Sequence, residues 1–105
     1  MTAKDILIKA RGLISQEDSW IEGDLEDSNG ARCSIGAISY AAAGRAEYQL
    51  PQSRAAVKKL AKTIDPEGSW RDYELAEDIV VEYNDTHDHD CVLAAFDAAI
   101  KGTKK

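Results

Sequence analysis

Apolar residues recur at helical spacing in five stretches of the chain. In the first stretch they fall on one side, and Lys4, Lys9 and Arg11 fall on the other, which is typical of an amphipathic helix. Thr2 followed by Asp5 has the form of a capping box and predicts where this helix begins. The apolar side consists of Ala3, Ile6, Leu7, Ala10, Leu13 and Ile14.

The second and third helices are delimited by capping and turn residues. Ser34 is a good N-cap for the second helix, which ends near Gly44, and Gly36 inside it would allow close packing. The third helix follows Pro51 and ends at the turn sequence 65–68. Its polar side is the one basic face that the sequence predicts, formed by Arg54, Lys58, Lys59 and Lys62.

The last two helices complete the predicted fold. The fourth begins at Ser69 or Asp72, although its run of Ile and Val at residues 79–81 also suits a strand. The fifth ends at Gly102, before a frayed basic tail at residues 103–105. The pattern therefore predicts a mainly α, single helical domain over residues 1–102, with about five short helices around one core.

The segment between the first two helices is acidic and rich in turn residues. Residues 17–27 contain six acids and no base, and Asn29-Gly30 is the commonest two-residue hairpin turn. One interpretation is a short hairpin that pairs residues 21–26 with residues 31–33; the other is an irregular loop.

Composition limits the class of protein. The formal net charge of −6 argues against a surface that attracts nucleic-acid phosphates, so we expect no direct nucleic-acid binding. No apolar run approaches the roughly 20 residues that a membrane-spanning helix needs. Cys33 and Cys91 lie far apart, and no apolar signal segment is seen at the N-terminus, so we expect a cytoplasmic protein with free thiols.

Three short patterns point to a family. They are Trp20-x2-Gly23, Gly30-x2-Cys33-x2-Gly36-Ala37, and Tyr83-Asn84-Asp85 before a final helix that contains Val92-Leu93 and Phe96-Asp97. With them, nearly the whole chain resembles the small actinobacterial and actinobacteriophage proteins of the family DUF6197. There the third pattern usually begins with Trp, and no histidines are fixed where this chain has His87 and His89. The resemblance implies a phage or actinobacterial setting and no established activity.

Cys33 is the candidate nucleophile. A thiol at a helix N-terminus has a lowered pKa, and with His87 or His89 and Asn84 it would form a Cys-His-Asn arrangement suited to a hydrolase or transferase. The interpretation that we favour makes Cys33 a small buried side chain beside Gly36. The protein is then not an enzyme.

The segment after the fourth helix holds candidate metal ligands. In an extended segment, His87, His89 and Cys91 would share one side and could bind zinc. Alternatively, Asp88 caps the last helix and Asp90 complements its dipole. We favour the second interpretation, because structural zinc sites draw ligands from two places, and we expect neither a metal nor another cofactor.

Acidic and aromatic residues are candidates for partner binding. Residues 65–90 hold ten acids against the single base Arg71, and such a surface could mimic DNA and inhibit a nucleic-acid-binding protein, although a solvated acidic face is the interpretation we favour. Trp20 and Trp70 could anchor an interface, but at least one is expected in the core. Residues 83–85 (Tyr83, Asn84 and Asp85) could line a pocket, and we favour a turn-holding role for them.

The leading hypothesis is a small cytoplasmic protein, encoded by a phage or prophage, that binds a host or phage protein. It rests on the missing catalytic set, the small size and the separation of acidic segments from the basic face. Self-association as a homodimer through the alanine-rich helices is a further hypothesis.

Overall fold

The computed structural model describes residues 1–103 and confirms the predicted mainly α fold. Two single 3₁₀ turns, η1 and η2, accompany five α-helices. The elements are α1 (Ala3–Leu13), η1 (Glu17–Ser19), α2 (Ser34–Ala43), η2 (Pro51–Ser53), α3 (Arg54–Ile64), α4 (Tyr73–Thr86) and α5 (His89–Lys101).

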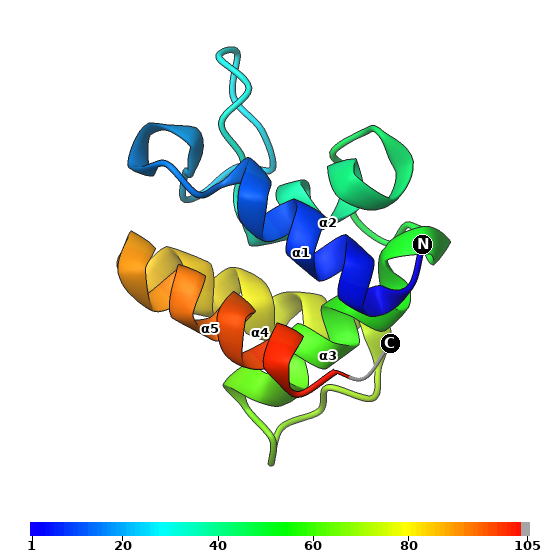
Figure 1. Ribbon diagram of the computed structural model, residues 1–105. Coiled ribbons are helices and arrows are strands. Elements are labelled where there is room, and N and C mark those ends of the chain that lie inside the picture. The colour runs from blue at the N-terminus through cyan, green and yellow to red at the C-terminus, as the bar shows by residue number, and fades with distance from the viewer. Residues whose placement is uncertain (104–105) are drawn as a thin grey trace.

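The helices pack around one hydrophobic core. In Figure 1, α1 lies across the bundle with α2 behind it. Helices α4 and α5 run side by side below α1, and α3 lies at the lower right. Phe96 of α5 is fully buried, and the core around it includes Leu7 of α1, Ile38 of α2, Leu60 of α3 and Val80 of α4. Every helix therefore contributes to the same buried cluster, as expected for a single domain.

Most predicted helix ends are confirmed, with one correction. Thr2 and Asp5 form the capping box of α1, with the Asp5 N–H donating to the Thr2 hydroxyl at 3.1 Å, and Asp88 caps α5. At α2, however, the N-cap is Cys33 and not Ser34: the Cys33 sulfur accepts the N–H of Gly36 at 3.4 Å. Ser34 is instead the first helical residue and is buried.

Two ambiguous segments are settled by the structure. Residues 79–81 belong to α4 and form no strand, and Asp72 caps this helix by accepting the N–H of Leu75 at 3.1 Å. Thr103, which we expected in a frayed tail, is buried and donates a hydrogen bond to the carbonyl of Ala99 at 2.7 Å. The other two residues of that tail, 104 and 105, lie outside the described residues.

The segment between α1 and α2 is a loop with one tight turn. Arg32 makes single bridges to Trp20 and Glu26, and no strand forms in residues 1–103. The backbone of Asp27 bonds to Gly30 and Ala31, and Gly30 has φ +83°. Asn29 has no positive φ, so the predicted two-residue hairpin turn is wrong: the turn has three residues, and glycine takes the left-handed position.

Gly12 is the one glycine inside α1, and no neighbouring group needs the space that its missing side chain leaves. A Cβ at this position would meet no atom within 4 Å. Because glycine costs about 1 kcal/mol relative to alanine inside a helix, Gly12→Ala should raise the free energy of unfolding by about 0.5–1 kcal/mol. Urea unfolding of the two proteins checks this, and a lower stability of the variant would contradict it.

Candidate functional site

Asn84, near the end of α4, connects three segments of the chain. Its side chain is 1% exposed. Its Oδ1 accepts hydrogen bonds from the Trp20 indole at 2.8 Å, from the Ser34 N–H at 3.0 Å and from the Ser34 hydroxyl at 2.8 Å. Its Nδ2 donates to the carbonyl of Ile21 at 3.0 Å. Asn84 therefore attaches the loop and the start of α2 to α4, and its hydrogen bonds are made within the fold.

Asp85 extends this attachment by one residue. Its carboxylate accepts the N–H of Gly23 at 3.0 Å and the side-chain amide of Asn84 at 3.1 Å. We expected Asn84 and Asp85 to hold the turn at their own position. Instead, they hold a loop that is more than 60 residues away in sequence.

Cys33 lies beneath the same loop, with little room around it. It is 4% exposed, and it lines a cavity of about 20 Å³ together with Asn84, Asp85 and Tyr48. Burial raises the pKa of its thiol, against the smaller lowering effect of the Gly36 N–H. The expected lowering of this pKa at the helix N-terminus is therefore wrong, because burial has the larger effect. The cavity suits about one water molecule and not a substrate.

The reactivity of Cys33 can be measured directly. We expect iodoacetamide to leave Cys33 unmodified in the folded protein at neutral pH, because its thiol is buried and its raised pKa disfavours the thiolate. Peptide mass spectrometry after labelling, with and without guanidinium chloride, separates this outcome from the alternative. Rapid alkylation of Cys33 without denaturant would restore the enzyme hypothesis.

The two histidines lie in different environments. His89 is buried, its Nε2 donates to the carbonyl of Ile14 at 2.6 Å, and its ring stacks on Trp20 with centroids 5.4 Å apart. His87 is exposed and stacks on Tyr83 with centroids 3.8 Å apart. Trp20 and His89 thus pack together, and no hydrogen bond joins either histidine to Cys33 among the described residues.

The proposed metal ligands do not share a site. His89 and Cys91 belong to α5, so the extended segment that would align them with His87 is not formed. Cys91 is half-buried, and the neighbouring carboxylate of Asp88 raises the pKa of its thiol. Within residues 1–103, no three His, Cys, Asp or Glu side chains are grouped so that they could hold a metal ion.

Trp70 lies in the connection between α3 and α4, and two cationic side chains lie over its ring. It is half-buried, and its indole donates to the carbonyl of Pro66 at 3.2 Å. Lys62 lies 4.9 Å and Arg71 4.2 Å from the centroid of its ring. These contacts tie Trp70 to α3 and to the turn that follows it.

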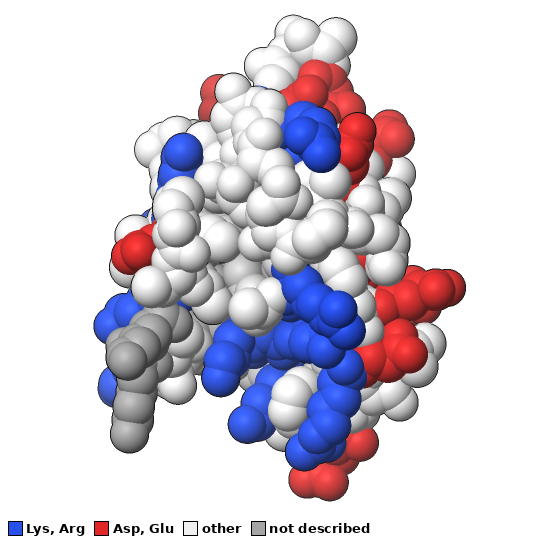
Figure 2. Space-filling view, turned by 90° about the vertical axis from the view of Figure 1, so that its right-hand side faces the viewer, with Lys and Arg blue, Asp and Glu red and all other residues white. Residues whose placement is uncertain are grey.

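The basic face predicted for α3 is present. Figure 2 shows basic side chains gathered in the lower half of one face of the molecule, with acidic side chains along its right edge. Arg54, Lys59 and Lys62 are exposed, and Lys58 is half-buried. None of these four forms an ion pair with a residue in the described part of the chain.

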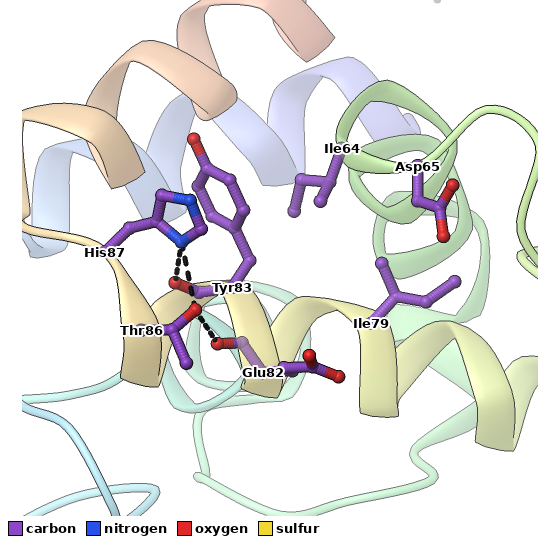
Figure 3. Close-up of a pocket in the computed structure, with 7 residues that line it drawn as sticks. All are labelled: Ile64, Asp65, Ile79, Glu82, Tyr83, Thr86 and His87. Atoms are coloured by element: carbon purple, nitrogen blue, oxygen red, sulfur yellow. Dashed lines mark hydrogen bonds between the residues drawn. The ribbon is translucent and has the colours of Figure 1, made fainter.

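A groove of about 150 Å³ lies where α3 and α4 approach their C-terminal ends, and we call it the α3–α4 groove (Figure 3). Tyr83 stands between His87 on one side and Ile64 and Ile79 on the other. The carboxylate of Glu82 lies on the α4 side, and that of Asp65 follows the last residue of α3. The residues that line it are Ile64, Asp65, Ile79, Glu82, Tyr83, Thr86 and His87.

The free polar atoms of the groove are hydrogen-bond acceptors. The carboxylates of Asp65 and Glu82 make neither an ion pair nor a hydrogen bond within residues 1–103. The Nδ1 of His87 lies 3.0 Å from the carbonyl of Tyr83, and because a carbonyl only accepts, Nδ1 carries the hydrogen. The Thr86 hydroxyl donates to the carbonyl of Glu82 at 2.7 Å.

Two of the residues singled out in the sequence, Tyr83 and His87, line this groove. Five others serve the loop attachment: Trp20, Cys33, Asn84, Asp85 and His89. Five lining residues were missed: Ile64, Asp65, Ile79, Glu82 and Thr86. One signal was available on α4, because residues 79 and 83, and likewise 82 and 86, are four apart and share a helix face. The contribution from α3 had no such signal.

The fold and this groove define the protein as a small helical domain with an acidic, aromatic-lined groove. A family model described as "Family of unknown function (DUF6197)" matches residues 1–102, and the chain belongs to this family. No curated protein and no solved structure shows significant similarity to the chain. Among residues 1–103, no helix has the length and apolar character needed to cross a membrane.

Proposed function

We propose that the protein functions by binding another protein, and that the α3–α4 groove is the docking point. One observation carries the proposal: Tyr83 and His87 form a stacked pair at an open groove whose two carboxylates have no partner within the described residues. Aromatic side chains and unpaired charges at a concave site are typical of protein interfaces. The expectations of a phage or prophage gene and of cytoplasmic function belong to this proposal.

The two alternative functions have less support. The Cys33 enzyme has less support because the thiol is 4% exposed and its own cavity measures about 20 Å³, while the adjoining hollow of about 360 Å³ is lined by Gly23, Asp24 and Tyr48 and not by Cys33. The DNA mimic needs a continuous field of free carboxylates, but four of the ten acids between residues 65 and 90 accept backbone N–H groups of the fold. These four are Asp72, Glu77, Asp85 and Asp88.

Affinity purification with a groove variant tests the proposal. In I79A/H87A, the apolar floor and the stacked imidazole are removed, so a partner that docks in the groove should be recovered at least about tenfold less well than with the unaltered protein. The measurement is quantitative mass spectrometry of proteins captured from an actinobacterial lysate.

The matched control is I8A, because Ile8 is an isoleucine on α1 that is 50% exposed and lies outside the groove. I8A should retain the partner, and melting temperatures should show that both variants are folded. Equal recovery by I79A/H87A would overturn the proposed function, because the partner would not dock in this groove. Light scattering of the purified protein distinguishes a second copy of the chain from a different partner, since a stable dimer would favour self-association.

A further inference from the structure

We infer that the α3–α4 groove takes an arginine side chain from a basic segment of the protein partner. This inference rests on the proposed function and adds the chemistry of the partner to it. The groove combines a limited volume, an excess of acceptors and an exposed aromatic pair, and each of these features favours one kind of occupant.

The volume favours a single side chain. Sites for small-molecule ligands usually enclose roughly 300–1,000 Å³, and the α3–α4 groove encloses about 150 Å³. A groove of this size has room for the end of one long side chain. It is too small to bury a substrate or cofactor of ordinary size.

The hydrogen-bonding groups favour a ligand that only donates. The free polar atoms are the carboxylate oxygens of Asp65 and Glu82. Arginine carries five N–H donors and no acceptor, so its guanidinium can donate to carboxylates without bringing an unmatched acceptor into the groove. An anionic ligand such as a carboxylate or a phosphate would meet the like charge of these two carboxylates.

The groove walls favour guanidinium over ammonium. Tyr83 has His87 on one side and opens on its other side toward Ile64 and Ile79 (Figure 3). A planar, weakly hydrated guanidinium stacks on such a ring, and the methylene stem of arginine packs on isoleucine. A strongly hydrated ammonium loses more solvation on entering an apolar groove.

The surrounding charges also favour a cation. The groove lies at the C-terminal ends of α3 and α4, where the helix dipoles are negative. Two nearby basic side chains, Lys62 of α3 and Arg71 of the connection to α4, lie over the ring of Trp70 and do not line the groove.

Titration with small probes, followed by two-dimensional NMR, tests the inference on the purified full chain. We expect N-acetyl-arginine amide to shift the resonances of residues 64–65 and 79–87 and to bind more tightly than N-acetyl-lysine amide or the uncharged N-acetyl-norleucine amide. In D65N/E82Q the affinity for the arginine probe should fall about fivefold to tenfold, the loss expected for two exposed ion pairs.

The matched control is E17Q/D18N, which makes the same change of charge at two exposed acids of η1 that do not line the groove. It should bind the arginine probe as the unaltered protein does. Equal losses of affinity in both variants would show that binding depends only on the net charge of the protein, and this would overturn the inference. Equal or tighter binding of the lysine probe, or no shifts at the groove, would overturn it as well.

Failure of the inference is distinguishable from failure of the proposed function. If the norleucine probe binds the groove as well as the arginine probe, the arginine inference is overturned, while protein docking in the groove stands. If I79A/H87A captures the partner as well as the unaltered protein does, the proposed function itself is overturned.

Discussion

Replacing Asn84 with alanine is expected to lower the free energy of unfolding by about 3–5 kcal/mol, because one side chain satisfies four buried or half-buried groups. The Ser34 N–H and hydroxyl, the Trp20 indole and the Ile21 carbonyl would lose their partner together. A domain of this size commonly has a total stability of about 5–15 kcal/mol, so the variant would be close to unfolded under mild conditions. Urea unfolding monitored by tryptophan fluorescence provides the measurement.

The control for this change is Asn29→Ala. Asn29 is exposed, and its side chain makes no hydrogen bond within the described residues, so the same substitution there should change stability by less than about 0.5 kcal/mol. A loss below 1 kcal/mol for Asn84→Ala would mean that water replaces the amide, and it would contradict the attachment role.

Replacing Gly36 with alanine is the second change with a large expected effect, a loss of about 2–4 kcal/mol. A Cβ at position 36 would lie 1.9 Å from the carbonyl oxygen and 2.8 Å from the carbonyl carbon of Leu25. These are backbone atoms, so the loop itself must move, and the hydrogen bond from the Cys33 N–H to the Leu25 carbonyl, now 3.3 Å long, would be strained. Thermal and urea unfolding measure the loss.

Gly12→Ala is the matched control, because it is the same substitution in a helix where a Cβ meets nothing. Intrinsic helix propensity favours alanine at both positions by about 1 kcal/mol, so opposite signs at positions 12 and 36 would isolate the contact with Leu25. Equal stabilisation by both substitutions would show that the loop shifts away from α2 at little cost.

These two predictions concern residues of the family pattern, and together they explain what the pattern is for. Gly36 lets the loop approach α2, and Asn84 and Asp85 hold that loop against α4 through Trp20, Ile21 and Gly23. Gly36, Asn84 and Asp85 of the pattern thus specify the fold, whereas Tyr83 of the same pattern lines the α3–α4 groove beside residues that no pattern marks.

Local patterns in the sequence determined the five helices and most of their ends. Helical spacing of apolar residues and short-range caps such as Thr2 with Asp5, or Asp88 with Cys91, act over three or four residues, so they can be read directly from the chain. The close packing at Gly36 was also predicted, because a glycine inside a helix is costly unless a neighbouring backbone needs the space.

Only the tertiary structure decided which side chains are used within the fold and which stay free. The burial of Cys33 had been the favoured interpretation of the sequence, but His89 became an interior group because the end of α1 covers it, and Glu77 accepts the N–H of Gln49 across 28 residues. The α3–α4 groove likewise joins Ile64 to Tyr83. Such contacts depend on how distant segments pack, and local spacing carries no information about that packing.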